Sequence, residues 1–145
     1  MYYGFHIIEA MASFKKATLF DPNCAMLYWA QALSYGPNIN DYGYRASLDA
    51  LAAMAKANEL KSTATPFEQD LINAMQVRYT SDSADATRAT LNQAYSDKMK
   101  QLASLYSKNP DAKTLYADAM MLQHPWDLWT PDGKPKPWTP AIRQV

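Results

Sequence analysis

The sequence predicts an all-α fold built from antiparallel pairs of helices, and three observations lead to this prediction. The 145 residues include only four glycines against many alanines, leucines and methionines, a composition that favours helix over sheet. Three prolines, Pro22, Pro66 and Pro110, are spaced 44 residues apart. Apolar residues after them recur at the intervals of one helix face. We therefore expect three helix–turn–helix units of about 44 residues, the third incomplete.

Each of these prolines is expected in the first turn of a helix. Proline is tolerated there because its missing N–H would have no helical partner. Thr65 and Glu68, on either side of Pro66, also fit the spacing of a capping box. Five residues after each proline comes a leucine, which the repeat makes an equivalent buried position in every unit: Leu27, Leu71 and Leu115.

The second helices of the pairs are predicted from apolar stripes. Ala50, Met54 and Ala57 fall on one face of a helix. A longer stripe of the same kind consists of Leu91, Tyr95, Met99, Leu102 and Tyr106. Turn-forming residues at 36–41 and 80–83 separate the paired helices. These patterns place the helical repeats at residues 1–129.

Residues 130–145 are predicted to form an irregular tail that contains proline and tryptophan. Four prolines after residue 130 interrupt any long helix, and only Thr139 to Ile142 resembles the start of another one. We expect Trp126, Trp129 and Trp138 to hold this tail against the last helix pair.

The N-terminal residues resemble a tetratricopeptide repeat. Ala10, Phe14, Ala17 and Pro22 match the second half of that repeat, in which small and large residues alternate and a proline follows. Ala32 and Tyr35 match its first helix. Three longer segments, 5–14, 21–26 and 36–40, look like those of a group of bacterial tetratricopeptide-repeat proteins. The resemblance implies a right-handed α–α superhelix, a solenoid whose first helices line a concave binding surface.

Two features depart from that family. The 44-residue spacing is nearer to that of other helical-pair solenoids, so a HEAT-like arrangement of the middle of the chain stays open. Trp29 and Leu33 stand where some tetratricopeptide domains carry a polar clamp for chaperone C-termini. The resemblance therefore does not extend to that ligand.

Composition excludes several classes of function. Fourteen Lys and Arg balance fourteen Asp and Glu, and the longest basic run is Lys15-Lys16. Nucleic acids and anionic membranes require a net or clustered positive charge, so neither is an expected partner. The single Cys24 rules out an internal disulfide and a multi-cysteine zinc site. No segment has the length of a membrane span, and a soluble chain of either the cytoplasm or the periplasm is expected.

The candidate partner-binding residues lie in the first complete helix and in the turn after it. Tyr28 and Trp29 are neighbours and must point to different parts of the helix surface, so one of them is expected to face the groove. Tyr35 has the spacing of a residue that either packs between helices or faces the same groove. Asn38 and Asn40 carry donors and acceptors for a partner's backbone, although Asn also serves to form turns.

No catalytic or cofactor motif is found, so we expect neither catalysis nor a cofactor. His6 and Glu9 are three residues apart and are weak metal candidates on one helix face. A stable metal site needs three or four ligands, which makes a structural pair the favoured interpretation of these two residues.

The predicted function is a protein- or peptide-binding scaffold or adaptor. Two alternatives stay open: a non-catalytic or metal-binding segment of a larger bacterial enzyme complex, and a self-assembly element. The second is suggested by the ends of the chain, since the face of Ala10, Phe14 and Ala17 lacks a preceding partner helix and a helix starting at Thr139 has no room to run. Uncapped solenoid ends expose apolar surface, so we expect self-association or continuation into a longer protein.

Overall fold

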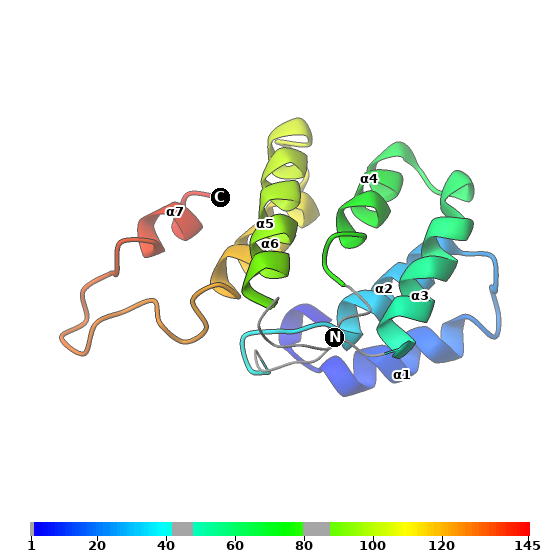
Figure 1. The fold of residues 1–145 in the computed structure, drawn as a ribbon, viewed down its shortest axis with the longest axis horizontal. Helices are drawn as coiled ribbons and strands as arrows, with labels where there is room; N and C mark the ends of the chain where they lie inside the picture. The colour runs from blue at the N-terminus through cyan, green and yellow to red at the C-terminus, as the bar shows by residue number, and fades with distance from the viewer. Residues whose placement is uncertain (1, 42–47, 80–87) are drawn as a thin grey trace. The chain divides into compact units, whose positions relative to one another are not determined.

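The computed structural model describes residues 2–41, 48–79 and 88–145. Within these ranges the regular structure is helical, with no strand and two isolated β-bridges, which confirms the all-α prediction. The chain divides into two compact units (Figure 1). Unit 1 consists of Met1–Gly36 and Ala46–Ser83, and unit 2 of Pro37–Arg45 and Ala84–Val145. None of the helices in the described ranges is long and apolar enough to cross a membrane.

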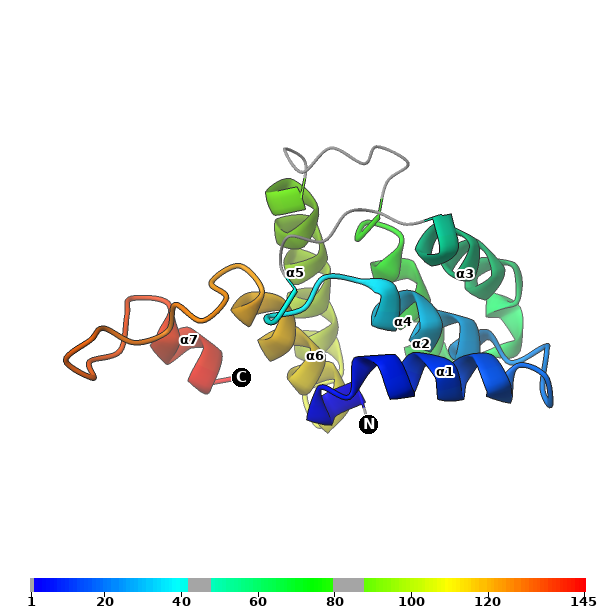
Figure 2. The same ribbon diagram turned by 90° about the horizontal axis from the view of Figure 1, so that it is seen from below.

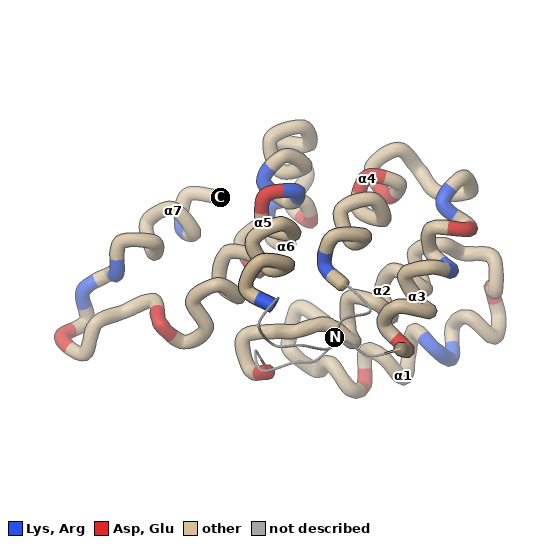
Figure 3. Tube along the Cα trace, in the orientation of Figure 1, with Lys and Arg blue, Asp and Glu red and all other residues tan. Residues whose placement is uncertain are grey.

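Unit 1 is organised around its second helix. It contains α1 (Ile7–Ala17), α2 (Ala25–Tyr35), α3 (Leu48–Glu59) and α4 (Pro66–Met75), with 3-10 turns at Tyr2–Gly4 and Lys61–Thr63. Helix α2 packs against α1, α3 and α4, and Figure 2 shows it between α1 and α3. Helix α2, with the sequence AMLYWAQALSY, contains no charged residue, and Figure 3 shows no Lys, Arg, Asp or Glu along it. A helix without charges on any face is suited to burial on several sides.

Small residues allow these helices to approach closely. Ala10 of α1, Ala25 and Ala32 of α2, and Ala50 and Ala57 of α3 are all buried. Ala50 and Ala57 belong to the predicted apolar stripe, whose third member, Met54, is half-buried. The helical face predicted for this segment is therefore confirmed.

Two of the three predicted helix starts are confirmed. Helix α4 begins at Pro66, and Thr65 and Glu68 form the predicted capping box, with the Thr65 amide donating to Glu68 Oε2 over 2.8 Å. Helix α6 (Pro110–Met121) begins at Pro110, where the Asn109 side chain accepts from the amides of Asp111 and Ala112.

The prediction for Pro22 is wrong, because α2 begins three residues later, at Ala25. The Asp21 carboxylate accepts from the amide of Asn23 over 3.3 Å, which forms a turn on the side chain of Asp21 before the helix. Pro22 lies inside that turn. Its carbonyl accepts from the Tyr28 hydroxyl over 3.0 Å, so the turn is held against the first part of α2.

The later start of α2 also changes the leucine register. Leu71 and Leu115 are buried, as predicted, but Leu27 is only half-buried. The prediction that the three leucines are equivalent buried positions is therefore wrong for Leu27. In α2 the buried large apolar side chains are Trp29 and Leu33.

Unit 2 contains the long helix α5 (Arg88–Leu105), α6 and the short α7 (Thr139–Arg143). Helices α5 and α6 pack together and are joined by only four residues, 106–109, as in an antiparallel helical hairpin. Of the predicted stripe in this helix, Tyr95, Met99 and Leu102 are buried, and Leu91 and Tyr106 are half-buried. The chain leaves α6 in a loop and returns so that α7 contacts α6. The turn predicted at 80–83 lies outside the described residues.

Three contacts fix the end of α2 against the segment around α4. The Trp29 indole N–H donates to the carbonyl of Leu71 over 3.1 Å. The Tyr79 hydroxyl donates to the carbonyl of Ala32. In a continuing helix the Gly36 amide would donate to this carbonyl, but here it donates to the Leu33 carbonyl, so Tyr79 supplies the missing donor. A Cβ at Gly36 would lie 2.3 Å from the Tyr79 hydroxyl oxygen and 2.9 Å from Arg78 Nε. Gly36 is therefore required for this close approach.

We predict that Leu71→Ala lowers the free energy of unfolding by about 2–5 kcal/mol, because it leaves a cavity beside α2. Leu27→Ala is the matched control and should cost clearly less, since Leu27 is half-buried. Urea denaturation followed by circular dichroism measures both. Equal losses for the two variants would show that Leu27 is as buried as Leu71, as the 44-residue register predicts.

We predict that Gly36→Ala lowers the free energy of unfolding by about 1–3 kcal/mol, because the added methyl group overpacks the contact with Tyr79. The same substitution in a Tyr79→Phe background should cost less, since the nearest clashing atom is gone. Denaturation midpoints of the four proteins give this coupling. Additive effects would show that Gly36 and Tyr79 do not meet.

Candidate functional site

A largely apolar pocket of about 430 Å³ lies in unit 1, between the N-terminal segment, α1 and α2. No charged residue lines it, and its lining consists of Tyr2, Tyr3, Phe14, Met26, Leu27, Trp29, Ala30 and Leu33. Pockets that bind ligands are usually of 300–1,000 Å³ and are mostly apolar with a few polar groups. Among the lining side chains the polar groups are the two tyrosine hydroxyls and the Trp29 indole N–H, and the N–H donates to the Leu71 carbonyl outside the pocket.

Helix α2 supplies the floor of this pocket because of the spacing of its apolar residues. Met26, Ala30 and Leu33 are at i, i+4 and i+7 and share one helix face. Leu27 borders that face, and Ala30 is small, which leaves the space open. Trp29 is buried and extends toward α4, where its N–H bonds Leu71. Its indole therefore forms a fixed wall of the pocket.

The N-terminal segment forms the opposite wall. Residues 2–4 make one 3-10 turn, closed by the bond from the Phe5 amide to the Tyr2 carbonyl over 2.8 Å. The rings of Tyr2 and Tyr3 meet edge to face with centroids 6.1 Å apart. Phe5 has a φ of 59°, in the left-handed region that costs a non-glycine residue about 1–2 kcal/mol. Backbone strain of this kind is often found at binding sites.

Of the predicted partner-binding residues in unit 1, only Trp29 lines the pocket. Tyr28 uses its hydroxyl to bond the Pro22 carbonyl. Tyr35 lies beneath the Lys15 ammonium, which is 5.2 Å from the ring centroid. A hydrogen bond to the Tyr35 side chain raises the pKa of Lys15 above its ordinary value. Both tyrosines thus have structural contacts inside unit 1.

Asn38 and Asn40 belong to unit 2. The Asn38 side chain accepts from the amides of Asn40 and Asp41, over 2.9 and 3.2 Å. Backbone bonds between Asn38 and Asp41 close the same turn. Asn38 therefore uses its side-chain carbonyl to shape the loop, whereas Asn40 is exposed.

The weak metal candidates lie at the start of α1. His6 is the N-cap residue, without a capping hydrogen bond from its side chain, and Glu9 is in the first turn. Both side chains are exposed. Among the described residues, no group of three or more His, Cys, Asp and Glu side chains is arranged to hold a metal ion.

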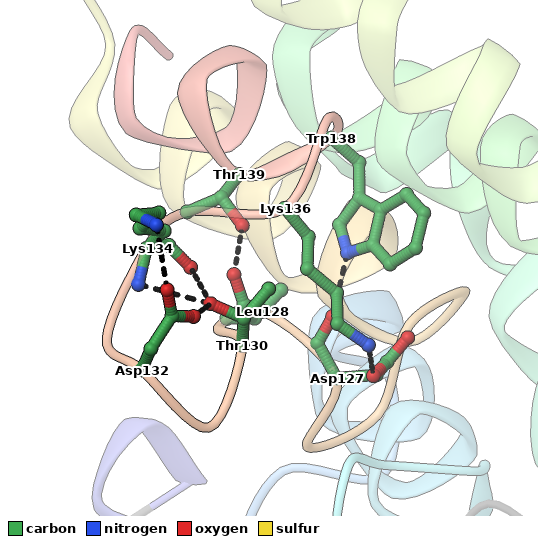
Figure 4. Close-up of polar contacts among 8 residues, drawn as sticks. All are labelled: Asp127, Leu128, Thr130, Asp132, Lys134, Lys136, Trp138 and Thr139. Carbon is green, nitrogen blue, oxygen red and sulfur yellow. Dashed lines mark hydrogen bonds and ion pairs between the residues drawn. The ribbon is translucent and has the colours of Figure 1, made fainter.

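The C-terminal tail of unit 2 forms several polar contacts of its own, which Figure 4 shows. Around a turn at Gly133, the Thr130 amide donates to the Lys134 carbonyl, and the Lys134 amide donates to the Thr130 hydroxyl. Lys136 forms an ion pair with Asp127, and the Thr139 hydroxyl donates to the Leu128 carbonyl. The tail therefore satisfies much of its own hydrogen bonding.

The expectation that three tryptophans hold this tail is right only for Trp138. Its ring stacks on His124 with centroids 4.0 Å apart, and its N–H donates to the Asp127 carbonyl over 2.7 Å. Trp126 and Trp129 are 76% and 49% exposed, so the prediction is wrong for them. The loop's own bonds fold it without these two rings.

Sequence reasoning missed the pocket and the order of the tail. The signal for the pocket was the uncharged α2, whose apolar residues exceed what packing on one face requires. The signal for the tail was the repeated triplet at 129–131 and 138–140, in which each threonine hydroxyl forms a tail contact.

No protein-family model matches this chain, and neither a curated protein nor a solved structure matches it. The resemblance to tetratricopeptide repeats thus depends on the residues that carry it.

Proposed function

We propose that this chain is a binding module, without catalysis of its own, that holds a peptide or protein segment through the apolar pocket of unit 1. The observation that carries the proposal is the 430 Å³ pocket whose lining includes no charged residue. In this proposal the helix pairs form a tetratricopeptide-like, right-handed solenoid that presents the pocket. The starts of α4 and α6 at Pro66 and Pro110 support the repeat, since they keep the 44-residue spacing.

The proposed occupant is a bulky apolar side chain of the partner. A charged group entering this pocket would lose water without gaining an opposite charge, at a cost of several kcal/mol. An apolar side chain gains about 25 cal/mol for each Å² that it buries. Tyr3 and Phe5, both exposed at the N-terminal wall, extend the apolar surface beyond the pocket. Aromatic and aliphatic residues of this kind often dominate the energy of an interface.

Self-association is the second candidate, favoured by exposed apolar residues on α1 and just after it. Ile8, Leu19 and Phe20 are each more than three-quarters exposed. Large apolar residues exposed at the two ends of one helix can form an interface between copies. The remaining alternative, a segment of an enzyme complex, has no comparable feature among the described residues.

The proposal predicts that peptides selected from a displayed random library share a bulky apolar residue, and that Ala30→Gln weakens their binding at least about tenfold, or 1.4 kcal/mol. Ala30 is half-buried in the pocket, and glutamine is compatible with a helix while filling the space. Fluorescence anisotropy of labelled peptides measures the affinity.

Ala52→Gln is the matched control, because Ala52 is exposed on α3 and outside the pocket lining. It should bind the selected peptides as wild type does. Peptides that bind Ala30→Gln undiminished would overturn the proposal. So would a dimer, seen by light scattering, that Ala30→Gln dissociates, since a second copy would then be the occupant.

A further inference from the structure

A second groove, of different chemistry, lies within unit 2 and is independent of the apolar pocket. It has a volume of about 300 Å³ between α5, α6 and α7. Its lining consists of Lys100, Ala103, Ser104, Ser107, Lys113, Tyr116, Met120, Ala141, Gln144 and Val145. No Asp or Glu side chain is among them.

Two helical stripes bring hydrogen-bond donors into this groove. Lys100, Ser104 and Ser107 follow one another at i, i+4 and i+7 along α5 and the turn after it. Lys113 and Tyr116 are three residues apart on α6. Lys100, Ser104, Ser107 and Lys113 are exposed, so their ammonium and hydroxyl groups lie on the open side of the groove, where a ligand can reach them.

These donors are not used inside the described parts of the chain. None of the side chains of Lys100, Ser104, Ser107, Lys113 and Tyr116 forms a hydrogen bond or ion pair there. Three other lysines form ion pairs: Lys56 with Glu59, Lys134 with Asp132, and Lys136 with Asp127. Two ammonium groups that share one groove without an Asp or Glu side chain repel each other, and an anion between them would reduce that repulsion.

The surroundings strengthen the attraction for an anion. Lys113 is close to the N-terminus of α6, where the helix dipole adds partial positive charge. Ala103 and Met120 are half-buried apolar parts of the lining. Tyr116 is half-buried and offers its hydroxyl beside the lysines.

We propose that this groove binds a phosphate group, either free or carried by a phosphorylated partner. A phosphate monoester has a charge of about −1.5 to −2 at pH 7, which matches two lysines, and three acceptor oxygens for ammonium and hydroxyl donors. A carboxylate has one charge and two oxygens, so it would leave part of the donor set unused.

Titration with inorganic phosphate, followed by amide NMR at low and constant ionic strength, tests the proposal. Saturable shifts are expected around Lys100 to Ser107 and Lys113 to Tyr116. Lys100→Gln and Lys113→Gln should each weaken binding about three- to tenfold, as for charged hydrogen bonds in a partly exposed site, and the double variant more. The affinity for phosphate should rise with pH through the second ionisation of phosphate, because that step adds a negative charge to the ligand.

Lys98→Gln is the matched control, because Lys98 is exposed on the same helix, outside the groove, and its loss changes the net charge equally. Equal weakening by Lys98→Gln, or the absence of saturable shifts with phosphate, would overturn the proposal.

Phosphoserine and acetate are two further ligands for the same titration. Tighter binding of phosphoserine than of phosphate supports a phosphorylated partner, equal binding supports free phosphate, and acetate binding as tight as phosphate contradicts the assignment.

Discussion

The structure of unit 1 depends on how α2 is buried. This helix has neighbours on three sides, α1, α3 and α4, and no charge that would have to reach water. Its small residues, Ala25 and Ala32, let the neighbours approach, and its polar contacts are made inward. Trp29 bonds a carbonyl of α4, and Tyr79 bonds a carbonyl that the end of α2 leaves free. Gly36 then allows the chain to pass Tyr79 without a clash.

Most helix starts and faces could be predicted because they depend on nearby residues. Thr65 and Glu68 cap α4 with their own side chains, and Asn109 caps α6 in the same manner. Pro22 has an equally good local sequence, yet the turn formed by Asp21 delays the helix to Ala25. The competition between a proline helix start and an aspartate turn is not decided by local sequence, and the prediction for Leu27 failed with it.

The candidate sites could be predicted only in part, since a pocket is the space that packing leaves unfilled. Trp29 was identified from its position beside Tyr28, but Met26, Ala30 and Leu33 resemble core residues in sequence. What opens the pocket is the turn at residues 2–4, which places Tyr2 and Tyr3 opposite α2. In the tail, backbone and threonine bonds fold the loop, so the large apolar area of Trp126 and Trp129 does not determine its shape.

Whether a polar side chain has a hydrogen-bond partner within the chain separates structural residues from candidate binding residues. Asn38, Asp127 and Thr130 resemble binding residues by type, yet each has partners in its own loop. The donors of Lys100, Lys113 and Tyr116 lack such partners in the described residues and still converge on one groove. Burial gives the same separation for apolar residues: Leu71 and Leu115 are enclosed, whereas Leu27 borders open space. Side chains whose chemistry the fold leaves unused are thus the ones available for a ligand.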